Sequence, residues 1–319
     1  MRRFTPTPPR RPEGIRWLRS DGKPNISDRI YRVEGDAQII ATRPVYTVAK
    51  TAPVLEAAET MAYRWVRALP VVNPGSKALE GIVTAMDLVN YLGGGEYYNI
   101  VVNRHKDNIF HALRLEPVES IMNPNPIYVT IDAKIPEMIE KMVVHNIGVL
   151  PVLLPDGRVY GIVTEHDLVE RLVEKTVGRR VEEVMSKNVV TVSRKATLKE
   201  AMELMVKFGV RRLPIVEDDG RVWGIITAKD VVRYFGRHQA FENAPSGKVS
   251  EAISVPVTLV GTQGVHTIRP DADVGEAATK MMETKVSSLL VVDDEGRLLG
   301  IITERDILFA VATAKAPVA

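Results

Sequence analysis

A threonine hydroxyl and an aspartate carboxylate stand three residues apart at four places in this chain, each time after a glycine and two β-branched residues. An ionised carboxylate only accepts hydrogen bonds, so it suits a ligand with paired hydroxyl donors, such as the cis-diol of a ribose. A threonine hydroxyl beside the free N–H groups of a helix start suits an anion. The copies of this Gly-x-x-Thr-x-x-Asp motif are Gly81–Asp87, Gly161–Asp167, Gly224–Asp230 and Gly300–Asp306, here numbered copies one to four.

The motif aspartate also has a purely structural interpretation. Where a strand gives way to a helix, its carboxylate could cap the helix by accepting the first free N–H groups. Both roles stay open for every copy, and they do not exclude each other. We expect the most secure ribose ligands to be Asp230 and Asp167, and the weakest site to be copy one, because Met86 precedes Asp87 where the other copies have a basic residue.

A bound phosphate would need positive charge close to the motif. The basic residue before the aspartate is His166, Lys229 or Arg305, and a second basic position precedes the second strand of each repeat, with Arg211 and Arg212 as the best candidates. A solvated, exposed face is the alternative for these two arginines. The predicted ligand-binding residues are Thr84, Asp87, Thr164, His166, Asp167, Arg211, Arg212, Thr227, Lys229, Asp230, Thr303, Arg305 and Asp306.

Each motif closes a repeat that can be traced backwards along the chain. A short strand is followed by a helix with small and apolar residues on one face, then by two strands joined by a turn, the last of which ends at the motif threonine. The predicted first strands are 45–48, 127–129, 189–192 and 265–268, and the second strands are 69–72, 150–152, 213–216 and 289–292. The apolar third strands are expected to be buried on both faces. The fold class is therefore mixed α/β (α+β), built from four β-α-β-β-α units.

A unit of roughly 55–60 residues is small for an independent core, so we expect the units to pack in two pairs, copy one with two and copy three with four. The two pairs should stack or abut. The segment 93–117 separates the first two copies, and a helix is expected around Asn108–Leu115. Its Gly93-Gly94-Gly95 run favours a flexible exit from a helix, with a phosphate cradle as the alternative. Residues 254–264 form an insertion in copy four.

The unit that ends in Gly-x-x-Thr-x-x-Asp resembles the CBS domain, and four copies resemble two tandem CBS pairs. The resemblance covers about residues 37–315, with repeats at 37–92, 118–175, 178–238 and 248–315, the connecting segment 93–117 and a basic extended tail at 1–36. It implies an adenosine derivative in a cleft of the pair, typically AMP, ADP or ATP and sometimes NAD or S-adenosylmethionine. The resemblance also implies that the motif aspartate takes the ribose hydroxyls and that the threonine helps to hold phosphate.

The first 33 residues differ in composition from the rest of the chain. Nine basic residues stand against three acidic ones, whereas the whole chain has a net charge of only +2. Prolines exclude a long helix, and arginines interspersed with aromatic residues suit phosphate contacts and base stacking. The predicted RNA-binding residues are Arg2, Arg3, Phe4, Arg10, Arg11, Arg16, Trp17, Arg19, Lys23, Arg29 and Arg32. The alternatives are a solubility tail, a transit peptide, or a segment wrapped over the chain's own acidic remainder.

Two classes of function remain. The first is a non-enzymatic adenine-nucleotide sensor that docks on the ribosome or rRNA through the tail and silences translation, since four-copy chains resemble archaeal CBS proteins that include a ribosome-hibernation factor, a dual inhibitor of the ribosomal subunits. The second is an adenylate-sensing regulator of a protein enzyme or transporter without RNA binding. The tail distinguishes them, because only the first class needs it.

Composition sets bounds on other functions. Without cysteine there is no disulfide framework, thiol catalysis or cysteine metal site, and His105 and His111 are wrongly spaced for a metal site on one helix face. These histidines are expected to help the connecting segment pack or bind. No apolar run approaches a membrane span and no secretory signal is evident, so we expect a cytoplasmic protein without a membrane partner. No catalytic motif appears, so no catalytic cofactor is expected. Sequence-specific binding to DNA is not expected either.

Overall fold

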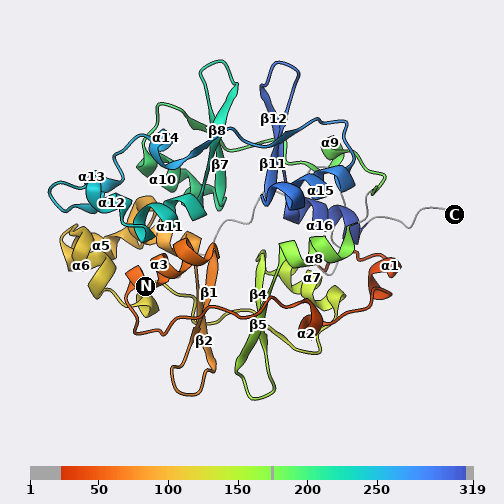
Figure 1. The fold of residues 1–319 in the computed structure, drawn as a ribbon, viewed down its shortest axis with the longest axis horizontal. Coiled ribbons are helices and arrows are strands. Elements are labelled where there is room, and N and C mark those ends of the chain that lie inside the picture. The colour runs from red at the N-terminus through yellow and green to blue at the C-terminus, as the bar shows by residue number, and fades with distance from the viewer. Residues whose placement is uncertain (1–22, 174–175, 314–319) are drawn as a thin grey trace. The chain divides into compact units, whose positions relative to one another are not determined.

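The computed structural model describes residues 23–173 and 176–313, which divide into two compact units. Unit one is formed by residues 46–126 and 190–264, and therefore holds copies one and three. Unit two holds copies two and four, formed by the described parts of 10–45, 127–189 and 265–319. Each unit thus combines two repeats that are not consecutive in the sequence (Figure 1).

The predicted β-α-β-β-α order is confirmed in all four copies, although the first strand of copy one is reduced to a parallel bridge from Val48 to Val71. The other first strands run parallel to the second strands, which pair antiparallel with the third. The first strands are β3 (Val129–Thr130), β6 (Val192–Ser193) and β10 (Thr267–Ile268). The second and third strands are β1 (Ala68–Val72), β2 (Leu79–Thr84), β4 (Val149–Leu153), β5 (Val159–Thr164), β7 (Arg212–Val216), β8 (Val222–Thr227), β11 (Ser288–Val292) and β12 (Leu298–Thr303).

The expected burial of the third strands on both faces is wrong in copies two and three. Val163 and Ile226 are fully buried, but their neighbours Ile162 and Ile225 are only partly so. Side chains alternate between the two faces of a strand, so one face can be covered by helices while the other is not. In copies one and four both apolar positions are buried.

Two helices flank each sheet, and the second of them begins directly after the motif threonine. The first helices are α3 (Val54–Arg64), α7 (Ile135–Val144), α10 (Leu198–Phe208) and α15 (Val274–Thr284). The second helices are α4 (Ala85–Val89), α8 (Glu165–Leu172), α11 (Ala228–Gly236) and α16 (Glu304–Ala312). The remaining described elements are α1 (Asp28–Tyr31), α2 (Ala37–Ile40), η1 (Asn90–Gly94), α5 (Tyr98–His105), α6 (Ile109–Leu115), η2 (Val118–Ser120), α9 (Val181–Val184), α12 (Gln239–Glu242), α13 (Val249–Ala252), α14 (Val257–Val260) and β9 (Thr262–Gln263).

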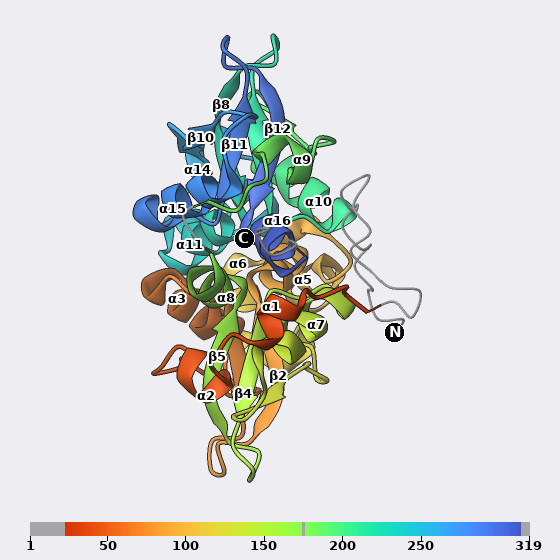
Figure 2. The same ribbon diagram turned by 90° about the vertical axis from the view of Figure 1, so that its right-hand side faces the viewer.

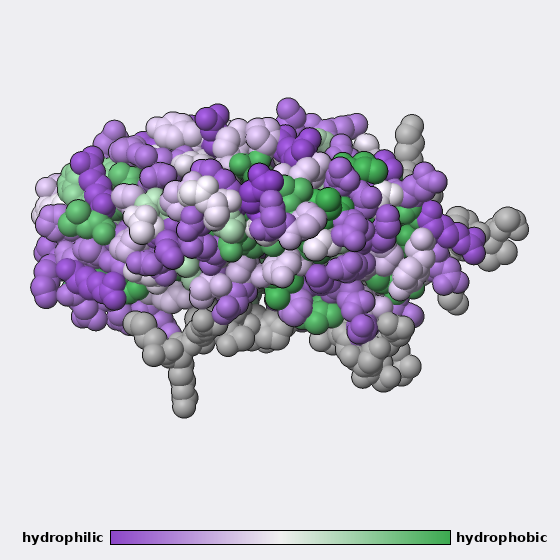
Figure 3. Space-filling model, turned by 90° about the horizontal axis from the view of Figure 1, so that it is seen from below, coloured by the Kyte–Doolittle hydropathy of each residue, from purple (hydrophilic) through white to green (hydrophobic). Residues whose placement is uncertain are grey.

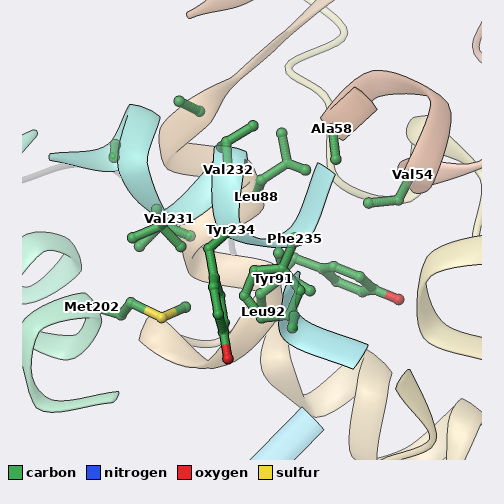
Figure 4. Close-up of a cluster of buried hydrophobic side chains, with 14 of the residues drawn as sticks. Val54, Ala58, Leu88, Tyr91, Leu92, Met202, Val231, Val232, Tyr234 and Phe235 are labelled. Atoms are coloured by element: carbon green, nitrogen blue, oxygen red, sulfur yellow. The ribbon is translucent and has the colours of Figure 1, made fainter. Parts of the chain in front are cut away.

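The core of unit one forms where α3 and α4 of copy one meet α11 of copy three. Figure 4 shows Val54 and Ala58 of α3 and Leu88 of α4 around Val232 and Phe235 of α11. The helices approach so closely that a side chain at Gly236 would overlap with the carbonyl of Ala58. Copies one and three therefore share one apolar core, in agreement with the expected contact between the two tandem pairs.

The glycine run of the connecting segment serves neither of the roles expected from the sequence. Gly93 and Gly94 are buried, and a Cβ on Gly94 would lie 2.8 Å from the carbonyl oxygen of Met202 in α10. The run is therefore a close-packing surface for α10, not a flexible exit or a phosphate cradle.

The predicted helix of the connecting segment is confirmed as α6, which Asn108 caps by accepting from the N–H of His111. His105 does contribute to packing, because its Nε2 lies 2.6 Å from Oε2 of the buried Glu116. Arg104 donates to the other carboxylate oxygen of Glu116 over 2.8 Å. One buried carboxylate thus fixes the end of the segment.

The core of unit two forms where α8 of copy two packs against α16 of copy four (Figure 1). The described part of the basic tail joins this core and is not simply extended. Ile30 in the short helix α1 is fully buried, and α1 packs on α7 while α2 packs on β5 (Figure 2). The extended tail predicted for residues 1–36 is therefore wrong for residues 28–31, because a buried isoleucine holds them on unit two.

The segment that precedes each repeat pairs with the third strand of the other copy of its consecutive pair, not with its own repeat. The segment before copy one bridges to copy two through Thr42 and Ile162, and the segment before copy two bridges back to copy one through Asn123 and Ile82. Copies three and four repeat the exchange through Ser186 with Ile301 and through β9 with β8. These backbone bridges link copy one to two and copy three to four, but the apolar cores join copy one to three and copy two to four, so the expectation that consecutive copies share a core is wrong.

This exchange explains the glycine of the motif. A Cβ on Gly81 would lie 2.9 Å from the carbonyl oxygen of Asn123, and one on Gly300 would lie 3.0 Å from that of Ser186. A Cβ on Gly224 would overlap with the carbonyl of Thr262 in β9. The glycine is needed because another backbone lies against it, not because of an unusual φ angle.

Among the described residues, no helix is long and apolar enough to cross a membrane. On the face drawn in Figure 3, hydrophobic residues form small, separate patches among hydrophilic ones.

We predict that Gly224→Ala lowers the free energy of unfolding by about 1–3 kcal/mol, because β8 and β9 must separate to admit the methyl group. Gly75→Ala is the matched control, since only the side chain of Asn73 approaches that position, at 3.5 Å. Denaturant unfolding of both variants measures the effect. Equal stability of Gly224→Ala and the wild type would show that the close approach does not constrain this position.

Candidate functional site

Each motif threonine caps the second helix of its repeat, and the aspartate three residues later completes a capping box. In copy one the Asp87 Oδ2 accepts from both the N–H and the hydroxyl of Thr84 at 2.7 Å, and the N–H of Asp87 points back to the threonine oxygen. The same bonds recur at Asp167, Asp230 and Asp306. The capping interpretation of the aspartate is therefore confirmed in all four copies, but it uses only the Oδ2 oxygen.

The second carboxylate oxygen has a different environment in different copies. Oδ1 of Asp167 accepts from the hydroxyl of Thr42 at 3.1 Å, and Oδ1 of Asp230 accepts from Arg233 Nη2 at 2.7 Å. Within the described part of the chain, Asp87 has Thr84 as its one hydrogen-bonding side chain, and its Oδ1 has no partner. Copy one therefore has an acceptor that a ligand could use without displacing a protein group.

Burial changes the acidity of these carboxylates. It raises the pKa of Asp87 to about 6, although the hydrogen bonds from Thr84 act in the opposite direction. Burial also raises the pKa of Asp230, despite the opposing effect of Thr227 and Arg233. Both aspartates are thus carboxylates whose charge is poorly solvated, which favours donors that approach them from a ligand.

In unit one the structure brings basic residues to the start of the capped helices. The N–H of Ala228, the first residue of α11, donates to the carbonyl of Arg211 at 2.9 Å, and Ala85 in copy one donates likewise to Arg67. Lys229 lies one residue before Asp230 and lines a small hollow with Arg233 and Trp65. Arg212 begins β7 and is partly buried.

In unit two the predicted cations are paired with buried glutamates. His166 Nδ1 lies 2.8 Å from Oε1 of Glu304, and Arg305 Nε donates to Oε1 of Glu165 at 2.5 Å. The contact with Glu304 raises the pKa of His166. Arg305 also donates to Asn146. Copies two and four are therefore joined by two reciprocal ion pairs, and the cations there are already balanced by carboxylates.

A signal for these ion pairs is present in the sequence, although the Gly-x-x-Thr-x-x-Asp pattern does not include it. Copies two and four have glutamate directly after the motif threonine, at positions 165 and 304, where copies one and three have Ala85 and Ala228. Arg233 and Thr42 were not predicted either, because neither lies inside the motif. Each contacts a motif aspartate through tertiary structure or through one helical turn.

The RNA-binding residues predicted in the tail fall into two groups. Lys23 pairs with Glu140 at 2.9 Å, Arg29 donates to the carbonyl of Leu172 at 3.3 Å, and Arg32 is exposed. The others lie outside the described residues: Arg2, Arg3, Phe4, Arg10, Arg11, Arg16, Trp17 and Arg19. Lys23 and Arg29 thus contact the protein itself.

The described residues contain no group of three or more His, Asp or Glu side chains that could hold a metal ion.

We predict that Asp87→Asn stabilises the ligand-free protein, and more so at pH 8 than at pH 5. The folded pKa of Asp87, about 6, lies above the value of 3.8 for a free aspartate, so its contribution to stability is present at low pH and is lost as pH rises through 6. Asparagine can keep the cap through its carbonyl oxygen but carries no charge. The gain at pH 8 should be on the order of 1–3 kcal/mol.

Urea unfolding at the two pH values measures this difference. Asp219→Asn, in the exposed turn between β7 and β8, is the control. A gain from Asp87→Asn that is the same at both pH values would contradict the buried charge.

Comparisons with known proteins agree with this geometry. The CBS domain family matches residues 35–94, 118–174, 181–237 and 258–313. Protein MJ1225 of Methanocaldococcus jannaschii is 33% identical over 272 residues, which are 85% of this chain and 96% of that protein. The crystal structure of MJ1225 matches this structure with a TM-score of 0.81, over 86% of this chain and 99% of that one. MJ1225 is described there as a proposed archaeal homologue of γ-AMPK.

A 33.4 kDa protein in a ribosomal RNA operon of Thermofilum pendens is 34% identical over 265 residues, 83% of this chain and 87% of that protein. A conserved protein of Pyrococcus horikoshii shares the fold, with a TM-score of 0.55 at 21% identity over 87% of this chain and 100% of its own. With four matched repeats that span more than half of its length, the chain belongs to the CBS domain family.

Proposed function

We propose that this protein is a non-enzymatic regulator that binds an adenine nucleotide (AMP, ADP or ATP) through its motif aspartates. The proposal rests on the different surroundings of the two oxygens of each motif carboxylate. One oxygen is fixed by the helix cap, so the other is held in a defined direction beside a helix start. Such an oxygen can accept from a ribose hydroxyl, while the motif threonine and the helix start lie next to the position of a phosphate.

The relationship to MJ1225 supports a regulatory role, since that protein is presented as a proposed homologue of γ-AMPK. The match to that relative covers 85% of this chain and 96% of the relative. A sensor with four copies of one motif can differ in affinity from copy to copy, and the different partners of the four aspartates favour such differences.

The geometry supports a different order of sites from the one expected from sequence. A diol on Asp167 or Asp230 must compete with Thr42 or Arg233, whereas Oδ1 of Asp87 has no partner to displace among the described residues. Copy one is therefore the site where we expect a ribose to bind with the least rearrangement, although the motif alone made it the weakest candidate.

We predict that Asp87→Asn weakens binding of AMP or ATP at least about tenfold, because the amide nitrogen cannot accept from the ribose and a charge-assisted hydrogen bond contributes about 1.5–3 kcal/mol. Asparagine is preferable to alanine, since it retains an acceptor for Thr84. Calorimetric titration of the four single variants at positions 87, 167, 230 and 306 gives the contribution of each copy. Asp219→Asn should bind as the wild type does. Wild-type affinity in all four motif variants would contradict the assignment.

A second proposal concerns the tail, which we suggest docks on ribosomal RNA and thereby regulates translation. Its arginine-rich composition supports this role, as does the relative from Thermofilum pendens that is named for a ribosomal RNA operon. Because Ile30 anchors the end of the tail on unit two, the part proposed for RNA contact is the segment before residue 23. An adenylate-dependent regulator of a protein enzyme or transporter is the alternative.

We predict that deletion of residues 1–22 releases most of the protein from ribosomes in a sedimentation assay. If the six arginines at positions 2, 3, 10, 11, 16 and 19 neutralise about six phosphates, log affinity should fall with log salt with a slope of about −4 to −5. Replacement of the six by lysine should preserve part of the slope but lower affinity, because lysine lacks the two-pronged contact.

The deletion retains Ile30, which anchors the end of the tail on unit two. Equal sedimentation of the truncated and full chains would show that the tail is not the anchor. Failure of the full chain to sediment would favour the alternative of a protein partner.

A further inference from the structure

Copy three differs from the others in the residue that lies one helical turn after the motif aspartate. Arg233 donates through Nη2 to Oδ1 of Asp230 at 2.7 Å, while the helix cap occupies Oδ2. The equivalent positions in the other copies are Asn90, Glu170 and Phe309. In copy three, a guanidinium group therefore occupies the oxygen that a ribose diol would use. The side chain of Asp230 in this ion pair is mostly buried, and that of Arg233 is partly exposed.

A tryptophan from copy one holds this arginine on its other side. The guanidinium of Arg233 lies 5.4 Å from the ring centroid of Trp65, which is 58% exposed. Trp65 ends α3 with a φ of 59°, in the left-handed region, where a bulky side chain is strained. Helices α10 and α15 end in the same conformation at Gly209 and Lys285, and Asn146 adopts it one residue after the C-cap of α7. Trp65 thus places its indole against Arg233 from a left-handed backbone position.

Arg233, Trp65 and Lys229 line one hollow at the junction of α3 and α11, with Met61, Val66 and Val232 among its walls. Two cations therefore border the same small hollow, and one of them, Arg233, donates to the carboxylate of Asp230. A guanidinium that leaves Asp230 can stay in this space, stacked on the indole. An anion at the mouth of this small hollow would meet both basic side chains.

We infer that Arg233 makes the copy-three site selective for a nucleoside phosphate over the corresponding nucleoside; this inference rests on the proposed function. The ribose hydroxyls of either ligand must displace the guanidinium from Asp230. A nucleoside leaves the displaced arginine without a counter-charge, whereas a nucleotide supplies its phosphate to Arg233 and Lys229. Exchange of one charged partner for another is much less unfavourable than loss of the partner.

The test compares AMP and adenosine by calorimetric titration of the full chain. The background variant combines Asp87→Asn, Asp167→Asn and Asp306→Asn. Copy three is then the one motif site left unchanged, so the titration measures binding there. We expect AMP to bind this background at least about tenfold more tightly than adenosine, since a charge-assisted hydrogen bond contributes about 1.5–3 kcal/mol. Arg233→Met should narrow that ratio at least about fivefold, mainly through tighter binding of adenosine, because Asp230 is then open.

Arg237→Met is the matched control, since Arg237 also stacks on Trp65, at 5.5 Å, whereas the ion pair with Asp230 is made by Arg233. It should leave the ratio unchanged. Arg233→Gln provides a second neutral variant if Arg233→Met lowers the melting temperature, and the same narrowing is expected. An unchanged ratio in both Arg233 variants, or an equal narrowing in Arg237→Met, would overturn the inference.

The outcomes also separate this inference from the proposed function. If the wild type binds AMP but the background does not, copy three is not a nucleotide site, and the inference fails while the proposed function stands. If the wild type binds no adenine nucleotide, the proposed function fails and the inference fails with it.

Discussion

The capping box between the motif threonine and aspartate is the interaction on which the candidate sites depend. It fixes the start of the second helix of every repeat and, with the same bonds, fixes the direction of the aspartate carboxylate. One oxygen is occupied by local structure, so the other needs no further ordering before it meets a ligand. The structural role of the motif is therefore compatible with the proposed binding role, because the two use different oxygens of the carboxylate.

The two cores are interleaved along the chain. Unit one joins copies one and three around α3 and α11, and unit two joins copies two and four around α8 and α16. The leading segments, meanwhile, are exchanged between consecutive copies. Each repeat is thus tied to one copy through a helical core and to another through its leading segment.

The motif has different charged neighbours in unit one and in unit two. In unit two, buried glutamates pair with His166 and Arg305, so any phosphate must compete with carboxylates for these cations. In unit one the positions after the threonine are alanines, and the basic residues Lys229 and Arg233 gather beside Trp65. Identical motifs can in this way give sites of different affinity and ligand preference, because the neighbours of the carboxylate decide what a ligand must displace.

The sequence by itself determined the repeat, its order of strands and helices, the helix α6 and the position of every motif aspartate, since these follow from local periodicity and capping. It did not determine which repeats share a core, why the motif begins with glycine, or the contact of Asp167 with Thr42. Those depend on contacts such as Thr262 against Gly224 and Thr42 against Asp167, between residues far apart in the chain. Local bonds are encoded within a few residues, whereas the charge and crowding around a carboxylate are set by whichever segments the fold brings to it.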